Sequence, residues 1–140
     1  FERYQHHYEL ITKNQVGSCA ANFGFTYKNG DKGNLYDVKG KFVVLFFHDP
    51  SCDECKHVKR VLENYRFAHE VAIMAIYIDQ DVELWRKSEC PDSWHNVYAS
   101  EIDSKALYNI RALPTLYLLD KQKHVLLKDV SVERLVRYLK

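Results

Sequence analysis

Hydrophobic residues form two unbroken runs of strand length near the middle of the chain. The runs extend from Phe42 to Phe47 and from Val71 to Ile78, with no alternation between apolar and polar positions. This pattern is typical of parallel strands that are covered on both faces. Between the runs, apolar residues recur at helical spacing, at Val58, Val61, Leu62 and Tyr65. The pattern therefore predicts two strands joined by a helix in a right-handed crossover.

Shorter patterns on both sides of this unit predict a hairpin, further strands and further helices. The stretch from Phe23 to Asp37 contains the turn sequence KNGDKG, and we expect a β-hairpin built on Gly30 and Gly33. The other predicted elements are a helix from Asp79 to Glu89 behind an acidic cap, a strand from Trp94 to Tyr98, a short helix from Ser104 to Ile110, an antiparallel pair from Leu116 to Leu119 and from His124 to Leu127, and a helix from Ser131 to Leu139.

The first residues of the chain have a different character. Aromatic and apolar residues at Tyr4, Tyr8 and Ile11 predict a short helical segment over residues 1–16, which we interpret as the tail of an upstream domain or a helix packed on the body. The stretch from Val16 to Asn22, which carries Cys19, has the composition of a linker. Because the chain opens at Phe1 without a basic or apolar leader, we expect it to be a piece of a longer protein, with one domain over residues 17–140.

Composition narrows the function classes. A chain of 140 residues with 46% hydrophobic residues can bury one proper core. The formal net charge of +1 gives no general electrostatic reason to bind nucleic acid or an anionic membrane. No apolar stretch approaches the roughly 20 residues that span a bilayer, so we expect no direct membrane insertion by this segment. Four cysteines are too few for a disulfide-stapled mini-protein.

The sequence CDEC is the strongest candidate for chemistry. Cys52 lies where the first apolar run gives way to a helix, and the free backbone N–H groups and the helix dipole there favour a thiolate. The thiolate is the attacking form of cysteine. Cys55 lies about one helical turn further on, close enough to close a disulfide with Cys52.

A zinc site is the competing interpretation, with Cys19, Cys90, His48 or His57 completing a tetrahedral set, but no second CxxC or HxxxH pattern is present.

The order of these elements, with CDEC at a helix start and Leu113–Pro114–Thr115 leading into a strand pair and a final helix, resembles that of the thioredoxin-like superfamily. Over residues 17–140 it looks most like the TlpA/ResA-type thiol-disulfide oxidoreductases, including Bacteroidetes-type envelope proteins. The resemblance implies an α/β, thioredoxin-like fold with a mixed central sheet of roughly four or five strands, helices on both faces and an N-terminal β-hairpin.

The resemblance also implies a function. Cys52 would be the nucleophile and Cys55 the resolving thiol of an enzyme that reduces protein disulfides, without an organic cofactor or a metal. Pro114 would be cis beside the cysteines, and the substrate would be bound by Leu113, Pro114, Thr115, Pro50 and Ser51. The implied partners are protein thiol and disulfide substrates and an electron-donor thiol protein, in the envelope or periplasm of a Gram-negative bacterium.

Four positions depart from the family pattern. Ser51 replaces the tryptophan before the first cysteine, Asp53 and Glu54 replace Gly-Pro, and Phe46 stands where thioredoxins bury an acidic residue. The proton acceptor near the second cysteine is thus missing, and His48, Glu83 or water are the substitutes. A non-catalytic binding module, whose CxxC is structural or vestigial, is the alternative function, because a fold does not fix a function.

Overall fold

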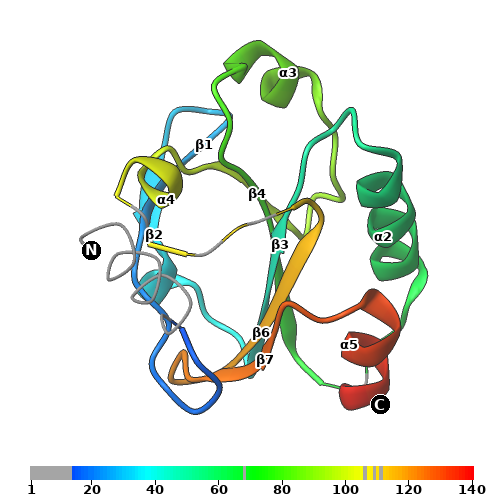
Figure 1. The fold of residues 1–140 in the computed structure, drawn as a ribbon. Helices are drawn as coiled ribbons and strands as arrows, with labels where there is room; N and C mark the ends of the chain where they lie inside the picture. Colours follow the sequence, from blue (N-terminus) through cyan, green and yellow to red (C-terminus); the bar gives the residue numbers. More distant parts are fainter. Residues whose placement is uncertain (1–13, 68, 106, 109, 111) are drawn as a thin grey trace, which may run out of the picture.

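A mixed sheet of seven strands runs through the described part of the chain (Figure 1). The computed structural model describes residues 14–67, 69–105, 107, 108, 110 and 112–140. The strands are β1 (Gly24–Tyr27), β2 (Lys32–Asn34), β3 (Phe42–Phe47), β4 (Val71–Tyr77), β5 (His95–Tyr98), β6 (Thr115–Asp120) and β7 (Val125–Lys128), in the spatial order β2-β1-β5-β4-β3-β6-β7. The helices are the 3-10 helix η1 (Leu35–Asp37), α2 (Asp53–Asn64), α3 (Val82–Lys87), α4 (Glu101–Ser104) and α5 (Val132–Tyr138).

Strand β3 lies inside the sheet, between β4 and β6. It pairs in parallel with β4 and antiparallel with β6, so that its last residue, Phe47, lies opposite Ile76 on one side and Thr115 on the other. The helix between β3 and β4 confirms the predicted strand–helix–strand unit. Because Val43 to Phe47 are all buried, the continuous apolar run is explained by cover on both faces.

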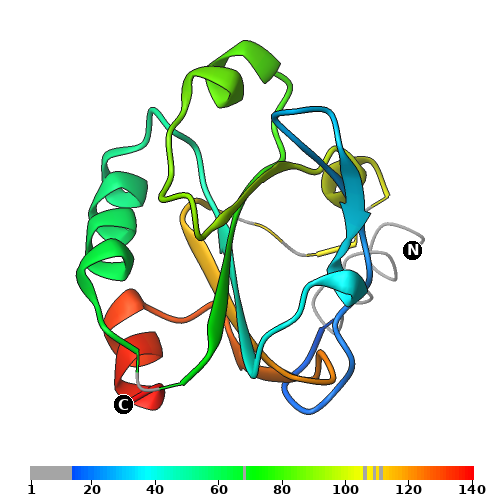
Figure 2. The same ribbon diagram turned by 180° about the vertical axis from the view of Figure 1, so that it is seen from behind.

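Two separate hydrophobic cores form on the faces of this sheet. Figures 1 and 2 show α2 and α5 together on one side of β3 and β6, and α4 on the other side. We call the side of α2 and α5 the helix face; its core contains Val44, Phe46, Cys55, Leu62 and Leu135. We call the opposite side the aromatic face; its core contains Phe23, Phe25, Phe47, Tyr108 and Tyr117. Alternate residues of β3 therefore serve different cores.

The N-terminal hairpin is confirmed, and it enlarges the sheet beyond the predicted four or five strands. Strand β1 pairs with β2 and also with β5, where Thr26 lies opposite Tyr98. The hairpin turn relies on Gly30, whose φ of +93° favours glycine, whereas Gly33 lies inside β2. The five strands β3 to β7 agree with the predicted four or five, and pairing between β1 and β5, which joins segments far apart in sequence, adds the hairpin to the same sheet.

Two local predictions also need correction. The stretch that carries Cys19 is more than a linker, because Cys19 forms a bridge with His124 and the Gly17 N–H donates to the Val125 carbonyl at 2.8 Å. The short helix predicted from Ser104 to Ile110 was misplaced, because α4 spans Glu101–Ser104 and ends where the prediction begins; the buried side chain of Ile102 anchors α4 in the aromatic-face core. The helix predicted over residues 1–16 lies almost entirely outside the described residues. None of the described helices has the length and hydrophobicity that a membrane span requires.

Candidate active site

The loop between β3 and α2 is held by its own backbone and side-chain hydrogen bonds. The carbonyl of Asp49 accepts from the Cys52 N–H at 3.0 Å, and one carboxylate oxygen of Asp49 accepts from both the N–H and the hydroxyl of Ser51. Cys52 is the N-cap of α2, and its sulfur accepts from the Cys55 N–H at 3.3 Å. The predicted position of Cys52 at a helix start is therefore confirmed, and its sulfur faces a free backbone donor of the first turn.

The two thiols of the CxxC sequence have different environments. Both cysteines are free, but Cys52 is half-buried whereas Cys55 is only 2% exposed. Burial raises the pKa of the Cys55 thiol to about 12, although the Asp49 N–H, which donates to its sulfur at 3.5 Å, acts in the opposite direction. The proximity of Cys52 raises that pKa as well. Cys55 is thus a protonated thiol at neutral pH, and Cys52 is the more accessible sulfur.

The segment before β6 lies against Cys52. The Leu113–Pro114 peptide bond is cis, the geometry that the resemblance implied. The Cys52 thiol donates to the Leu113 carbonyl at 3.9 Å, which brings this segment to the sulfur although the two residues are far apart in sequence. The Thr115 hydroxyl donates to the Ala112 carbonyl at 2.6 Å and so fixes the entry into β6.

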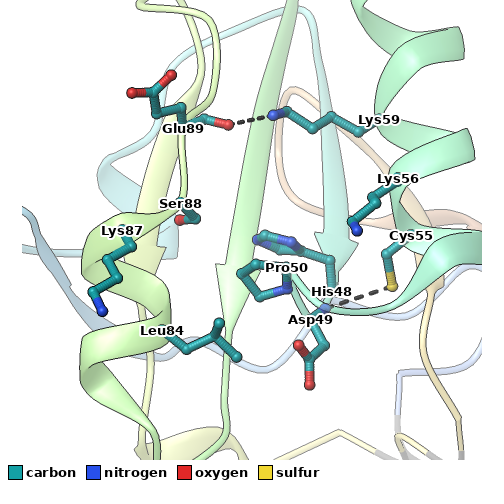
Figure 3. Close-up of a pocket in the computed structure, with 10 residues that line it drawn as sticks. All are labelled: His48, Asp49, Pro50, Cys55, Lys56, Lys59, Leu84, Lys87, Ser88 and Glu89. Atoms are coloured by element: carbon teal, nitrogen blue, oxygen red, sulfur yellow. Dashed lines mark hydrogen bonds between the residues drawn. The ribbon is translucent and has the colours of Figure 1, made fainter.

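Two cavities flank the start of α2. The first, of about 390 Å³, lies on the side of Cys55 and is lined by His48, Asp49, Pro50, Cys55, Lys56, Lys59, Leu84, Lys87, Ser88 and Glu89 (Figure 3). The second, of about 400 Å³, lies on the side of Pro114 and is lined by Glu54, His57, Val58, Pro114, Leu116, Val130, Ser131, Val132 and Glu133. Three lysines surround the first cavity, and two glutamates surround the second, so the two sides of the dithiol carry opposite charge.

The structure brings most of the predicted site residues together. Cys52, Cys55, Leu113 and Pro114 meet at the start of α2, and Pro50 lines the cavity on the side of Cys55. Ser51 is exposed, and its hydroxyl is turned to the carboxylate of its own loop.

Phe46 is fully buried in the helix-face core with Cys55. Of the substitutes considered for a buried acid, His48 shares a cavity with Cys55, whereas Glu83 is exposed and pairs with Arg86 at 3.1 Å. Lys59 is a lining residue that sequence reasoning missed; its spacing of four residues from Cys55 in a predicted helix was the available signal.

The remaining cysteines do not assemble a metal site with this pair. Within the described residues, no group of three or more His, Cys, Asp or Glu side chains is placed to hold a metal ion. Cys19 lies at the far end of β7 beside His124, and Cys90 packs at the border of the helix-face core. The arrangement of the described residues therefore offers thiol chemistry rather than a tetrahedral ligand set.

Comparison with known proteins agrees with this geometry. Residues 33–131 match the family described as thioredoxin-like domain. The chain is 30% identical to the thiol-disulfide oxidoreductase ResA of Bacillus thuringiensis over 148 aligned positions, which cover 100% of this chain and 86% of that protein. Among solved structures, a thioredoxin-like protein from Bacteroides caccae superposes with a TM-score of 0.92 at 34% identity, covering 99% of this chain. This chain spans 53% of the Bacteroides caccae protein. The C-terminal domain of an uncharacterized protein from Bacteroides fragilis superposes with a TM-score of 0.86 at 36% identity, covering 91% of this chain and 99% of that domain.

Proposed function

Because the chain belongs to the thioredoxin-like family and is related to the thiol-disulfide oxidoreductases named ResA, we propose that it reduces protein disulfides through Cys52 and Cys55. The observation that carries this proposal is the asymmetry of the two thiols. Cys52 is accessible at a helix N-terminus, and its sulfur accepts from the backbone N–H of Cys55. The thiol of Cys55 is buried and protonated. An attacking thiolate followed by a protected resolving thiol is the arrangement that sequential disulfide exchange needs.

The proposed reaction has two steps. The Cys52 thiolate attacks one sulfur of the substrate disulfide, which forms a mixed disulfide and releases the first substrate thiolate to take up a proton. Cys55 then loses its proton and attacks the Cys52 sulfur, which releases the second substrate thiolate and leaves a disulfide between Cys52 and Cys55. Two electrons have moved to the substrate, and the dithiol of a donor protein restores the starting state.

The segment at Pro114 supports binding of an extended substrate. The Leu113 carbonyl lies against the Cys52 sulfur, so a substrate strand that pairs with Leu113 and Thr115 would present its disulfide to Cys52. Pro50 lines the cavity on the side of Cys55 and Ser51 is exposed next to Cys52, and we propose that both also contact the substrate. We extend the proposal to location: the relatives from Bacteroides and the resemblance to envelope proteins support a place in the bacterial cell envelope, where protein disulfides occur.

Trapping of the mixed disulfide tests the reaction. In a background with Cys19→Ser and Cys90→Ser, the Cys55→Ser variant should accumulate mixed disulfides with a disulfide-bonded model protein, and Cys52→Ser should form none. Mass spectrometry after acid quench and alkylation gives both amounts. Formation of equal adducts by the two variants, or of none by either, would contradict the proposal and would favour the non-catalytic binding module.

The reduction potential of the Cys52–Cys55 pair tests whether the protein reduces disulfides or forms them. For a reductase we expect a single two-electron transition of the Cys52–Cys55 pair nearer the potential of thioredoxin, about −270 mV, than that of DsbA, about −120 mV. Equilibration in a dithiothreitol or glutathione series, read by mass after alkylation, measures it. A potential near −180 mV, typical of protein disulfide isomerase, would favour isomerase work instead.

A further inference from the structure

His48 is a buried polar residue that directly follows the last residue of β3. Its backbone N–H donates to the Ile76 carbonyl at 3.1 Å, which continues the pairing of β3 with β4 by one residue. The imidazole stacks on the ring of Phe46, with 5.0 Å between the ring centroids and 26° between the planes, and the residue is only 5% exposed. Among the described residues, the ring nitrogen Nε2 has no hydrogen-bond partner. A buried polar atom without a partner is costly, and it needs an explanation.

The cavity around the imidazole also contains the resolving thiol. His48 and Cys55 both line the cavity of about 390 Å³ between α2 and the segment that follows α3. Figure 3 shows the ring of His48 and the amine of Lys56 directed into this space, whereas the carboxylates of Asp49 and Glu89 are turned away from the ring. Of these residues, His48 is the group with an unpartnered nitrogen that can accept a proton.

Burial and the nearby charge of Lys59 keep this imidazole neutral. From α2, Lys56 and Lys59 face the cavity; from the segment at the end of α3, Lys87 and Glu89 border it; and Asp49 precedes α2. The pKa of His48 is lowered to about 4, first by burial and then by the charge of Lys59, whereas the charge of Asp49 acts in the opposite direction. At pH 5 to 8 the group is therefore an unprotonated base, which is the form that can take up a proton.

We propose that His48 takes the proton of Cys55, through a water in this cavity, when Cys55 attacks the mixed disulfide at Cys52. The inference rests on the proposed function and supplies the group that Phe46 cannot provide. The O–H bond of the bridging water breaks as its proton passes to Nε2, and the water in turn takes the proton of the Cys55 thiol. The Cys55 thiolate forms a bond to the Cys52 sulfur, the substrate thiolate leaves, and it recovers the proton from the imidazolium.

The timing of this transfer follows from the surroundings of Cys55. In the free dithiol, Cys52 raises the pKa of Cys55 through its charge and its hydrogen bond. That contribution is lost once the Cys52 sulfur is part of a mixed disulfide. The new Cys55 thiolate then lies in the same cavity as the imidazolium, and opposite charges in a poorly solvated site stabilise each other. Lys56 and Lys59 line the same cavity, and the Lys59 amine donates to the Glu89 carbonyl (Figure 3).

Rates of the two chemical steps test the proposal. In the Cys19→Ser, Cys90→Ser background, His48→Gln should slow resolution of the mixed disulfide by about 100-fold or more, because general-base assistance typically supplies a factor of that size. Its formation at Cys52 should stay within about two-fold, since His48 acts only on the second step. Acid quench and mass spectrometry at successive times resolve the two rates. His69→Gln, at an exposed histidine at the opposite end of the sheet, is the matched control.

A substrate-free measurement separates this inference from the proposed function. In a Cys52→Ser chain, the rate at which iodoacetamide alkylates Cys55 reports removal of its proton, and we expect His48→Gln to lower that rate about ten-fold at fixed pH. An unchanged rate, or equal slowing of formation and resolution, would overturn the role of His48. If the alkylation effect is present but no mixed disulfide ever forms, the proposed function fails and the role of His48 stands.

The wild-type protein provides a further measurement if His48→Gln does not fold. Resolution of the mixed disulfide should be slower in D₂O than in H₂O, and its rate should fall as the pH approaches 4, where the imidazole becomes protonated. Resolution without an isotope effect and without this fall would contradict proton transfer to His48.

Discussion

The two faces of the central sheet differ in what they bury. The helix face contains the side chains of Val44 and Phe46 from β3, and its core includes Cys55, with Cys52 and Cys90 packed at its border. The aromatic face takes the intervening residues Leu45 and Phe47 and packs them with rings from β1, β6 and the segment after α4. Three of the four cysteines therefore belong to one face, and the other face contains no buried cysteine among its described residues.

Because of this difference, alternate residues of β3 contribute either to the stability of the fold alone or also to the surroundings of the thiols. On the aromatic face, Phe47 makes ring contacts with Tyr108 and Tyr117 at centroid distances of 5.4 and 6.0 Å. Such contacts contribute to the fold, and they belong to the core on the other face of the sheet from Cys55. On the helix face, Phe46 packs in the core with Cys55 and stacks on His48. The same change of side chain should therefore have different consequences at adjacent positions of β3.

The largest expected effect compares Phe47→Ala with Phe46→Ala. Each removes a fully buried ring, and each should lower the free energy of unfolding by about 3–5 kcal/mol. Only Phe46→Ala should also shift the reduction potential of the Cys52–Cys55 pair, because only Phe46 packs against the surroundings of Cys55. Urea denaturation gives the first quantity and redox titration the second.

Milder variants keep this comparison measurable if the alanine variants are unfolded. Phe47→Leu and Phe46→Leu leave part of each side chain in place, and they should show the same contrast at lower cost in stability. An equal shift of the reduction potential in both variants would show that the two faces are not independent.

Extremes of pH should stress the two faces differently. The pKa of His48 falls from 6.5 in the unfolded chain to about 4 in the fold, so the unfolded state binds more protons between these values. Stability should consequently fall as the pH drops from 6.5 to 4, by about 3 kcal/mol from this residue alone. On the aromatic face, burial raises the pKa of Tyr117 from 10.0 in the unfolded chain to about 12 in the fold. The folded state therefore keeps the hydroxyl proton longer, and the free energy of unfolding should fall as the pH rises from 10 to 12.

Matched variants assign these pH effects. The free energy of unfolding, measured by urea denaturation at pH 4 and at pH 7, should depend less on pH in His48→Gln than in the wild type. His69→Gln should keep the wild-type difference. If His48→Gln loses as much stability on acidification as the wild type does, the buried imidazole is not the cause of that loss.

Local signals in the sequence predict much of this architecture. Both ends of β3 were predicted correctly because the polar residues Lys41 and His48 flank its apolar run. The helix predicted from Ser131 to Leu139 is α5, and the Ser131 hydroxyl caps it by accepting from the Arg134 N–H at 3.2 Å. The start of α2 at Cys52 followed from the same kind of short-range information.

Contacts between segments far apart in the sequence could not be predicted from such local patterns. The pairing of β1 with β5 and the bridge between Cys19 and His124 join segments that no local pattern connects. The site shows the same limit: the sequence offered His48, Glu83 or water in place of a buried acid without a basis for choice. Burial of His48 beside Cys55 and exposure of Glu83 are decided by the packing of α2 and α3.

The smallest expected effect distinguishes two tyrosines within the aromatic face. The Tyr108 hydroxyl donates to the Ala21 carbonyl at 2.7 Å, whereas the buried Tyr117 hydroxyl has no partner among the described residues. Tyr108→Phe should therefore lower the free energy of unfolding by about 1 kcal/mol, and Tyr117→Phe should raise it by a similar amount. The two substitutions remove the same atom, so each is the control for the other in urea denaturation. Neither should change the reduction potential of the dithiol, because both hydroxyls lie on the face opposite Cys55. Equal destabilisation by both would mean that Tyr117 has a hydrogen-bond partner in solution, and a shifted potential would mean that the aromatic face also influences the thiols.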